Sequence, residues 1–257
     1  MYILSCEVRP KAALYKSQKS MAEGKQLDLV LRDMLFVTWA VEPERARKLV
    51  PERLELDTRT DEAGRAMAFV SAVCFRVADV RSSMLLLPAL NFEQLNYRAY
   101  VKDGDRPAVC FLDMKVNSRM VTSLTSFLSV PIQYEDIDIK VSKPEFLGDA
   151  PEAQSYSVKS AGFQVDASIE GSSPSEGSDI GVEFVTDRLV GYMSAGDGVF
   201  KIKVEQPGLK CFSARVDSLR TNRLEELGLL NSGGATPRSA LYVREAPFGA
   251  EMPRRAW

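Results

Sequence analysis

The sequence contains no histidine among its 257 residues, and this absence excludes several kinds of active site. A Ser-His-Asp triad and a Cys-His nucleophile both need an imidazole, as does a His-ligated metal site. The four cysteines are widely separated and form no Cys-x-x-Cys pair, so we expect neither a zinc site nor a redox motif. Two of them, Cys74 and Cys110, lie in apolar stretches and are expected to be buried thiols. We predict no metal and no cofactor.

Long hydrophobic runs and a strong charge of one sign are also absent. The longest apolar runs, such as MLLLPAL (84–90), are far shorter than the roughly 20 residues that span a bilayer. The N-terminal stretch has no continuous apolar core of the kind found in signal peptides. A net charge of −2 and an isoelectric point of about 5.5 give no electrostatic footprint for nucleic acid. We therefore predict a cytoplasmic protein that binds neither membranes nor nucleic acid.

The pattern along the chain predicts an N-terminal extension over residues 1–25 and a single domain over 26–257. Short helices are expected at Pro43–Val50, after an N-cap at Asn117 or Ser118, and in NRLEELGLL (222–230). Most other segments are rich in β-branched and aromatic residues and predict strands, including GVEFVTDRLVGYMS (181–194). Asp103-Gly104 is a hairpin signal. These elements predict an α+β fold dominated by an antiparallel sheet or barrel.

Five stretches then resemble a known group in their order and spacing. They are TWAVEPERARKLVPERLELDT, FEQLNYRAYV, FLDMKVNSR, EFVTDRLVGY and TPRSALYV. From about residue 34 to 245 they follow the order found in the uncharacterised YqjF-like family, within the acetoacetate decarboxylase-like superfamily. The resemblance implies a double-layered, cone-like antiparallel β-barrel around an internal cavity, with a few packed helices. By analogy, it also implies a homo-oligomer.

The same resemblance bears on the chemistry of the site. In acetoacetate decarboxylases, the equivalent helix ends in Pro-Lys-Lys, and the first lysine forms a Schiff base with the keto acid. The second lysine lowers the pKa of the first, which is a well-known example of amine activation. The resemblance places Ile132 and Gln133 on these two positions. Neither side chain can attack a carbonyl, so an imine mechanism at this position is not expected.

The stretch NFEQLNYRAYV (91–101) supplies the main candidate residues. Strand alternation puts Gln94, Asn96, Arg98 and Tyr100 on one face, and Glu93 on the other. In the YqjF-like family this strand carries an acid, then Asn and Arg at the next two positions of the same face, and Gln94 stands where the acid would be. Arg98 is expected either to bind a ligand carboxylate or to form an internal ion pair.

Two further candidates are Lys115 and Arg188. Lys115 would be an amine nucleophile if it were desolvated inside the cavity, and otherwise would pair with Asp113 or face solvent. Arg188 matches a Thr-acid-Arg pattern of the family and is a candidate ligand-binding residue.

Other polar and aromatic residues have simpler interpretations. The acids Glu135, Asp136 and Asp138 lack the ligand spacing of a calcium loop and are expected to lie on a solvated strand edge. Trp39 is expected in the core, although it could also form the floor of a pocket.

Two hypotheses of function remain. The first is a binding protein whose cavity takes a small carboxylate or another amphipathic ligand, with Arg98, Asn96 and Tyr100 on its wall. The second is a lyase or hydratase that acts on an oxo-acid without an imine. In that enzyme Arg98 would stabilise charge, and Glu93, Tyr100 or Lys115 would carry out acid–base chemistry.

Overall fold

The computed structural model describes residues 26–82, 90–127, 130–142, 154–170, 180–233 and 235–257. The predicted extension (1–25) and most of the Ser/Gly-rich loop at 170–181 lie outside these ranges. All the described strands belong to one 15-stranded sheet, in which antiparallel neighbours predominate. None of the helices in the described ranges is long and apolar enough to cross a membrane.

The central part of the sheet closes into a barrel. Its neighbouring strands follow the order β12–β11–β6–β5–β4–β1–β14, and the pairs Val204↔Ala250 and Glu205↔Gly249 join β14 back to β12. The pairing of β6 with β11 is parallel, and the other neighbours in the ring are antiparallel. The barrel strands are β1 (Gln26–Val41), β4 (Ala66–Ser82), β5 (Phe92–Asp103), β6 (Arg106–Val116), β11 (Val190–Ala195), β12 (Gly198–Glu205) and β14 (Ser239–Glu251).

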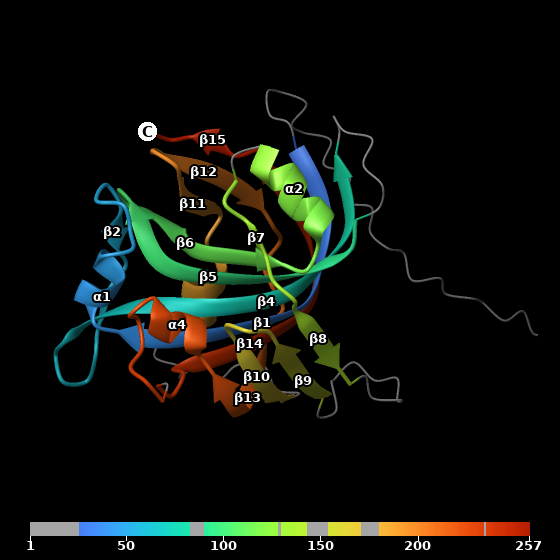
Figure 1. Ribbon diagram of the computed structural model, residues 1–257. Helices are drawn as coiled ribbons and strands as arrows, with labels where there is room; N and C mark the ends of the chain where they lie inside the picture. Colours follow the sequence, from blue (N-terminus) through green and yellow to red (C-terminus); the bar gives the residue numbers. More distant parts are fainter. Residues whose placement is uncertain (1–25, 83–89, 128–129, 143–153, 171–179, 234) are drawn as a thin grey trace, which may run out of the picture.

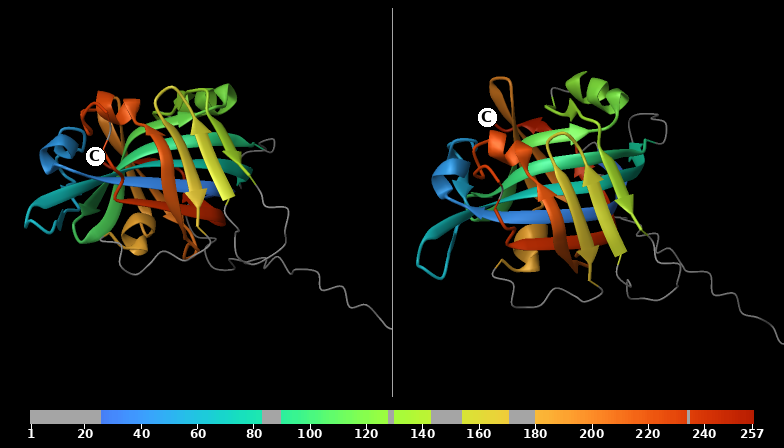
Figure 2. Two further views of the ribbon diagram at one scale, coloured as in Figure 1. Left: turned by 90° about the horizontal axis from the view of Figure 1, so that it is seen from below. Right: turned by 60° about the horizontal axis from the view of Figure 1, so that its bottom comes forward.

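A second layer extends from β14 and covers the outside of β1 and β4 (Figures 1 and 2). It contains β13 (Phe212–Arg220), β10 (Gln164–Ile169), β9 (Gln154–Lys159) and β8 (Asp138–Val141). Apolar side chains such as Val158 and Val165 of this layer pack against Leu35 and Cys74 of the barrel. A separate apolar cluster, with Phe36, Val73 and Val109, lies on the inner side of the barrel. The fold is therefore the mostly antiparallel, double-layered barrel that the sequence predicted.

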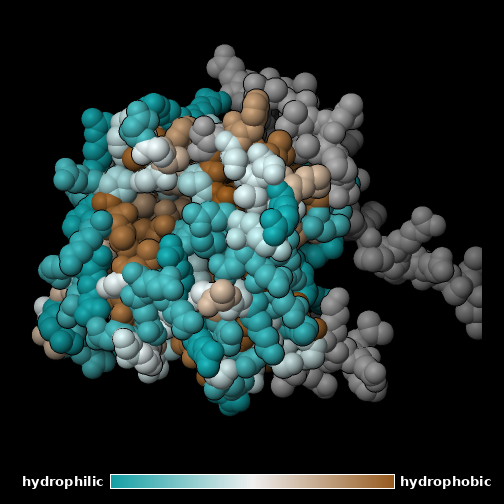
Figure 3. Space-filling model, in the orientation of Figure 1, coloured by the Kyte–Doolittle hydropathy of each residue, from teal (hydrophilic) through white to brown (hydrophobic). Residues whose placement is uncertain are grey.

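The remaining elements are short. The helices are α1 (Pro43–Arg47), α2 (Arg119–Phe127), α3 (Val182–Thr186) and α4 (Asn222–Glu226). The additional strands are β2 (Glu55–Leu56), β3 (Arg59–Thr60), β7 (Gln133–Tyr134) and β15 (Arg254–Arg255). In Figure 1, α2 lies beside the right-hand ends of the barrel strands, and α3 lies behind the barrel. Most of the face seen in Figure 3 is hydrophilic, with apolar side chains at the bottom of a hollow on its left.

Several local features follow from the sequence as predicted. Gly104 adopts a φ of 60° in the turn between β5 and β6, a conformation that a residue without a Cβ accepts at low cost. Ser118 is the residue that caps α2, because its Oγ accepts a hydrogen bond from the backbone N–H of Val121 at 3.4 Å. Trp39 is fully buried, and its indole N–H donates to the carbonyl of Ala235 at 2.8 Å. It is a core residue.

Three sequence-based boundaries were wrong. The helix α1 ends at Arg47, three residues before the predicted Val50. The segment 181–194 is not one strand, because its first part forms α3 and only Val190–Ala195 forms β11. Hydrogen bonds from Thr186 Oγ1 to the Val182 carbonyl and from Arg188 Nε to the Phe184 carbonyl hold this helical turn, so side-chain contacts override the β propensity. The helix α4 ends at Glu226, four residues before the predicted end, because Gly228 adopts a φ of 71°.

The predicted buried thiols and strand edge are also present. Cys74 and Cys110 are buried and free, and burial raises the pKa of the Cys110 thiol to about 12. Asp138 lies on β8, the last strand of the second layer, and pairs with Lys140 at 2.9 Å on the surface. Glu135 accepts a hydrogen bond from the backbone N–H of Gly162 at 3.1 Å. Asp138 therefore lies on an exposed strand edge, as predicted, whereas Glu135 is half-buried in the connection between β7 and β8.

Candidate functional site

A cavity of about 310 Å³ lies inside the barrel. Its wall is formed by inward-facing side chains of the barrel strands and by one face of α2. Most of these side chains are aliphatic or aromatic. The polar ones among the described residues are Gln94, Asn96, Arg98, Thr125, Thr186, Arg188 and Gln206. A largely apolar cavity with a few polar groups is the usual form of a small-molecule site.

The strand β5 contributes three neighbouring polar side chains to this wall. Gln94, Asn96 and Arg98 alternate with residues that face outward, as the sequence predicted. The Gln94 side-chain amide donates to Asn96 Oδ1 at 2.8 Å. The amide nitrogen of Asn96 has no protein acceptor among the described residues, so it can donate to a ligand.

Arg98 is a half-buried cation without a carboxylate partner in the described part of the chain. One of its terminal nitrogens donates to the carbonyl of Val185 at 2.7 Å and to the hydroxyl of Tyr100 at 3.2 Å. Its Nε is buried and has no hydrogen-bond acceptor. The guanidinium instead lies 5.2 Å from the ring centres of Phe36 and Tyr100, at a distance where the π faces attract a cation.

Arg188, the second arginine on the wall, has a carboxylate partner. It donates to Asp57 at 2.7 Å and to the carbonyl of Phe184 at 2.8 Å, and its side chain is 2% exposed. Burial lowers its pKa, and the Asp57 carboxylate partly offsets this effect. Asp57 also lies 3.4 Å from Lys102. The charge of Arg188 is therefore compensated inside the protein, whereas that of Arg98 is not.

Guanidinium groups and aromatic rings alternate through this part of the site. Each guanidinium carbon lies between 4.3 and 5.2 Å from a ring centre. The order of the stack is Arg59, Phe184, Arg188, Tyr100, Arg98 and Phe36. Such stacking fixes the position of the cations without neutralising them, so the positive potential at this end of the cavity is retained.

Tyr100 supports Arg98 from behind and is not on the cavity wall. It is fully buried, and its hydroxyl lies 2.7 Å from Ser71 Oγ, which in turn lies 2.7 Å from Thr38 Oγ1. Because an arginine can only donate, the Tyr100 oxygen accepts from Arg98, and in the bond between Tyr100 and Ser71 either hydroxyl can be the donor. Tyr100 therefore positions Arg98, and the structure does not place its hydroxyl against a ligand.

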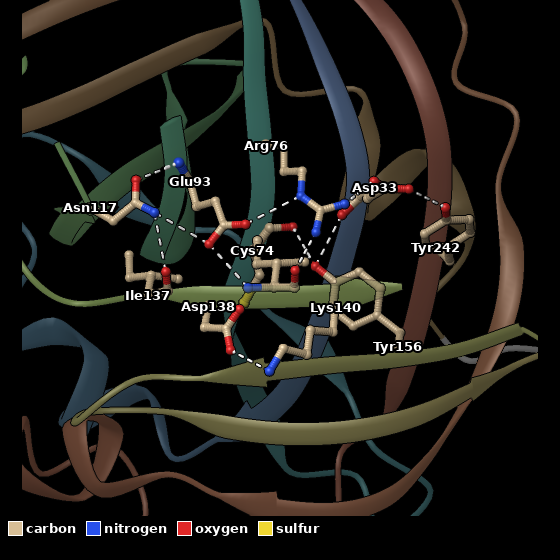
Figure 4. A network of polar contacts seen from close by, with 11 residues as sticks. Asp33, Cys74, Arg76, Glu93, Asn117, Ile137, Asp138, Lys140, Tyr156 and Tyr242 are labelled. Carbon is tan, nitrogen blue, oxygen red and sulfur yellow. Dashed lines mark hydrogen bonds and ion pairs between the residues drawn. The ribbon is translucent and has the colours of Figure 1, made fainter. Parts of the chain in front are cut away.

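Glu93 lies on the outer face of β5, away from the cavity (Figure 4). Its carboxylate accepts from Arg76 at 3.2 Å, from Asn117 at 3.3 Å and from the backbone N–H of Ile139 at 3.0 Å. Arg76 also donates to the Ile139 carbonyl and to Asp33, the latter at 2.6 Å. These bonds attach β8 of the second layer to the barrel. Burial raises the pKa of Glu93, although the Ile139 N–H and Arg76 act in the opposite direction.

Lys115 also faces away from the cavity. It lies 3.3 Å from Asp113 and donates to the side chain of Gln133, and neither Lys115 nor Gln133 is on the wall. Asp113 in turn accepts from Arg223 of α4 at 2.7 Å. The condition for a nucleophilic role, a desolvated amine inside the cavity, is therefore not met at Lys115. Ile132, the neighbour of Gln133, does line the cavity.

Comparison of the sequence with known families identifies the family of this chain. A model of the DUF2071 family, a group described as uncharacterised conserved proteins, matches residues 29–246. The chain belongs to this family. The uncharacterised protein YqjF of Bacillus subtilis (strain 168) is 33% identical over 121 residues, which are 46% of this chain and 46% of YqjF. The chain thus matches less than half the length of YqjF. The match nonetheless agrees with the YqjF-like resemblance found in the sequence.

Solved structures share the fold of this DUF2071 member. The enduracididine biosynthesis enzyme MppR, complexed with pyruvate, has a TM-score of 0.60 at 13% identity, with 93% of each chain covered. An acetoacetate decarboxylase-like enzyme from Sphingomonas wittichii RW1 has a TM-score of 0.57 at 13% identity, covering 95% of this chain and 98% of the other. The acetoacetate decarboxylase of Legionella pneumophila subsp. pneumophila str. Philadelphia 1 has a TM-score of 0.60 at 8% identity, covering 95% and 93%. The fold is acetoacetate decarboxylase-like.

Some residues of this site gave no signal in the sequence. Asp57, the partner of Arg188, is 131 positions away from it. Gln206 donates to the Thr186 carbonyl at 2.9 Å and lies on the wall, although nothing in its neighbourhood marks it as special. Within the described ranges, no three Cys, Asp or Glu side chains are grouped in a way that could hold a metal ion.

Proposed function

We propose that this protein binds a small carboxylate or carboxylate-bearing amphipathic molecule in the barrel cavity, with Arg98 as the anion-binding residue. The observation that supports this proposal is the Arg98 guanidinium on the cavity wall, a cation that has no carboxylate partner among the described residues. A charge removed from water is costly unless it is paired and hydrogen-bonded. A ligand carboxylate would supply the opposite charge and accept hydrogen bonds from the guanidinium.

The other wall residues have supporting roles in this proposal. Asn96 would donate its free amide hydrogens to the ligand, and Gln94 would hold the Asn96 amide in place. Arg188, whose charge is compensated by Asp57, would remain bonded to that carboxylate and form part of the wall. Ile132 would form part of the apolar wall. Glu93, Lys115 and Gln133 have no role in the cavity, because they lie on the other side of the barrel wall.

Calorimetric titration with hexanoate tests the proposal. Arg98→Met should weaken binding by about 10- to 100-fold, because a hydrogen bond to a charged group contributes about 1.5–3 kcal/mol. Arg32→Met is the matched control, since Arg32 lies on the exposed surface with Glu245 at 2.7 Å and Asp79 at 3.5 Å. That variant should bind hexanoate like the wild type. Equal affinities for all three proteins would refute the proposal.

A second candidate function is a lyase or hydratase that acts on an oxo-acid without an imine. The fold neighbours support it, because they include acetoacetate decarboxylases and a biosynthetic enzyme that was solved with pyruvate. The described residues of the cavity wall include no lysine. Borohydride treatment in the presence of pyruvate or acetoacetate should therefore leave the intact mass unchanged. A reduced lysine adduct would instead indicate Schiff-base chemistry and would exclude this imine-free mechanism.

A further inference from the structure

The cavity wall follows the barrel strands over a long distance. On β5 it extends from Phe92 to Arg98, six residue steps that correspond to about 20 Å at ~3.4 Å per residue. On β1 the wall residues extend from Leu27 to Phe36. A volume of about 310 Å³ distributed along such a wall describes a narrow, elongated space.

The two ends of this space differ in chemistry. Arg98 pairs across the sheet with Ser71, and Phe92 pairs with Val77, so Val77 lies at the opposite end of the wall from Arg98. Around that distant end, the described wall residues are Leu27, Leu29, Val77, Val80, Leu90, Phe92, Val121, Leu124 and Thr125. The hydroxyl of Thr125 is already used, since it donates to the carbonyls of Val121 at 2.9 Å and Thr122 at 3.1 Å. The distant end is therefore apolar.

The middle of the wall is compatible with an apolar chain. The Gln94 and Asn96 side chains bond to each other at 2.8 Å, so part of their hydrogen-bonding capacity is used within the protein. On the neighbouring strand β4, Val73 and Phe75 pair with Asn96 and Gln94, and Leu31 of β1 pairs with Val77, so apolar side chains flank the two amides. With the Asn96 amide hydrogens donated to the carboxylate, the alkyl chain passes only Gln94, whose amide already donates to Asn96, so little unpaired polar surface is removed from water.

From this arrangement, and on the basis of the proposed carboxylate binding, we infer that the ligand is an unbranched aliphatic monocarboxylate of medium chain length. Its carboxylate binds Arg98, and its alkyl chain extends toward Val77 and Leu29. A small oxo-acid would leave the apolar end unfilled. A dicarboxylate of the same length would place a second charge where the described wall residues offer no cation, which is strongly unfavourable.

A chain-length series tests this inference by calorimetry. Butanoate, hexanoate and octanoate should bind progressively more tightly, by about fourfold for each added methylene, since burying a CH₂ group contributes about 0.8 kcal/mol. Octanedioate should bind at least tenfold more weakly than octanoate. Octan-1-ol, which has the same chain without the charge, should also bind more weakly and should be insensitive to Arg98→Met.

Filling the distant end gives an independent test. Val77→Phe should weaken octanoate binding at least tenfold and leave butanoate binding unchanged, so butanoate reports that the variant is folded and that Arg98 is intact. Leu29→Phe, from the neighbouring strand β1, should act in the same way and replaces Val77→Phe if that variant does not fold. The two substitutions narrow the same part of the cavity from different strands.

The outcomes distinguish this inference from the proposal on which it rests. If butanoate, octanoate and octanedioate all bind equally well through Arg98, the chain-length inference is wrong and carboxylate binding stands. The same holds if Val77→Phe and Leu29→Phe fold but leave octanoate binding unchanged. If no carboxylate binds, or if Arg98→Met has no effect on any of them, both are wrong.

Discussion

The arginines on the outer and inner faces of the barrel wall have different partners. On the outer face, Arg76 of β4 bonds to Asp33 at 2.6 Å and to Glu93 at 3.2 Å, and it also bonds to the backbone of β8. On the inner face, Arg98 of β5 has a carbonyl, a hydroxyl and two aromatic rings around it, and no carboxylate in the described ranges. Both side chains come from adjacent strands of the same sheet. The outer charges hold the two layers together, and we propose that the inner charge binds a ligand.

The largest effect on stability is expected on the outer face. Arg76→Met leaves two part-buried carboxylates, Asp33 and Glu93, without their cation, so the two broken pairs together should cost about the 3–5 kcal/mol of one fully buried pair. Urea denaturation should show a loss of this size in the free energy of unfolding. Arg32→Met removes an exposed pair and should cost less than about 1 kcal/mol. A similar small loss for both variants would mean that the Arg76 network does not hold the layers together.

A smaller loss is expected at Arg188, and a still smaller one at Arg98. Arg188→Met removes one of the two cations beside Asp57, and Lys102 remains 3.4 Å from this carboxylate. We therefore expect a loss of about 3 kcal/mol in the free energy of unfolding. Arg98→Met removes a hydrogen bond to a carbonyl but leaves no carboxylate unpaired, and should cost about 1 kcal/mol. Urea denaturation of both variants in parallel measures this difference. If Arg98→Met costs as much as Arg188→Met, then Arg98 is structural.

The smallest effect concerns the pH dependence of stability at Glu93. Burial raises its pKa above the ordinary value of 4.5, so the folded protein holds this proton more tightly than the unfolded chain. The stabilisation from this more tightly held proton of Glu93 is fully present below pH 4.5 and is lost as the pH rises through the folded-state pKa. Glu93→Gln has no such titration. Urea denaturation from pH 4 to pH 7 should therefore show the wild type losing stability relative to Glu93→Gln, and a relative gain would contradict this assignment.

The sequence predicted the faces of β5 well because strand alternation depends on local geometry. Gln94, Asn96 and Arg98 were expected together on one face, with Glu93 on the other, and this arrangement is present. Alternation does not indicate which face of a strand meets the cavity, so the outward position of Lys115 could not be predicted. The pairing of Arg188 with Asp57 also escaped prediction, since it depends on how distant segments meet in the closed barrel.

The family resemblance supplied what local patterns could not. Closure of the barrel depends on the pairing of β12 with β14, and neither strand carries a signal for its partner. The family order of the five stretches predicted the double-layered barrel, and the fold neighbours agree with it. The helix α3 was missed because its β-branched and aromatic residues are typical of strands, while its stability comes from side chains that bond its carbonyls.

The most direct test of the difference between the two faces is a nitrogen-15 NMR titration of the arginine Nε–H groups with octanoate. The signals of Arg98 and Arg76 are assigned from their loss in Arg98→Met and in Arg76→Lys. The account predicts that the Arg98 Nε–H signal shifts as a carboxylate binds its guanidinium, while the Arg76 signal stays in place. Octanoate binding that leaves the Arg98 signal unchanged, or that moves the Arg76 signal instead, would contradict the account.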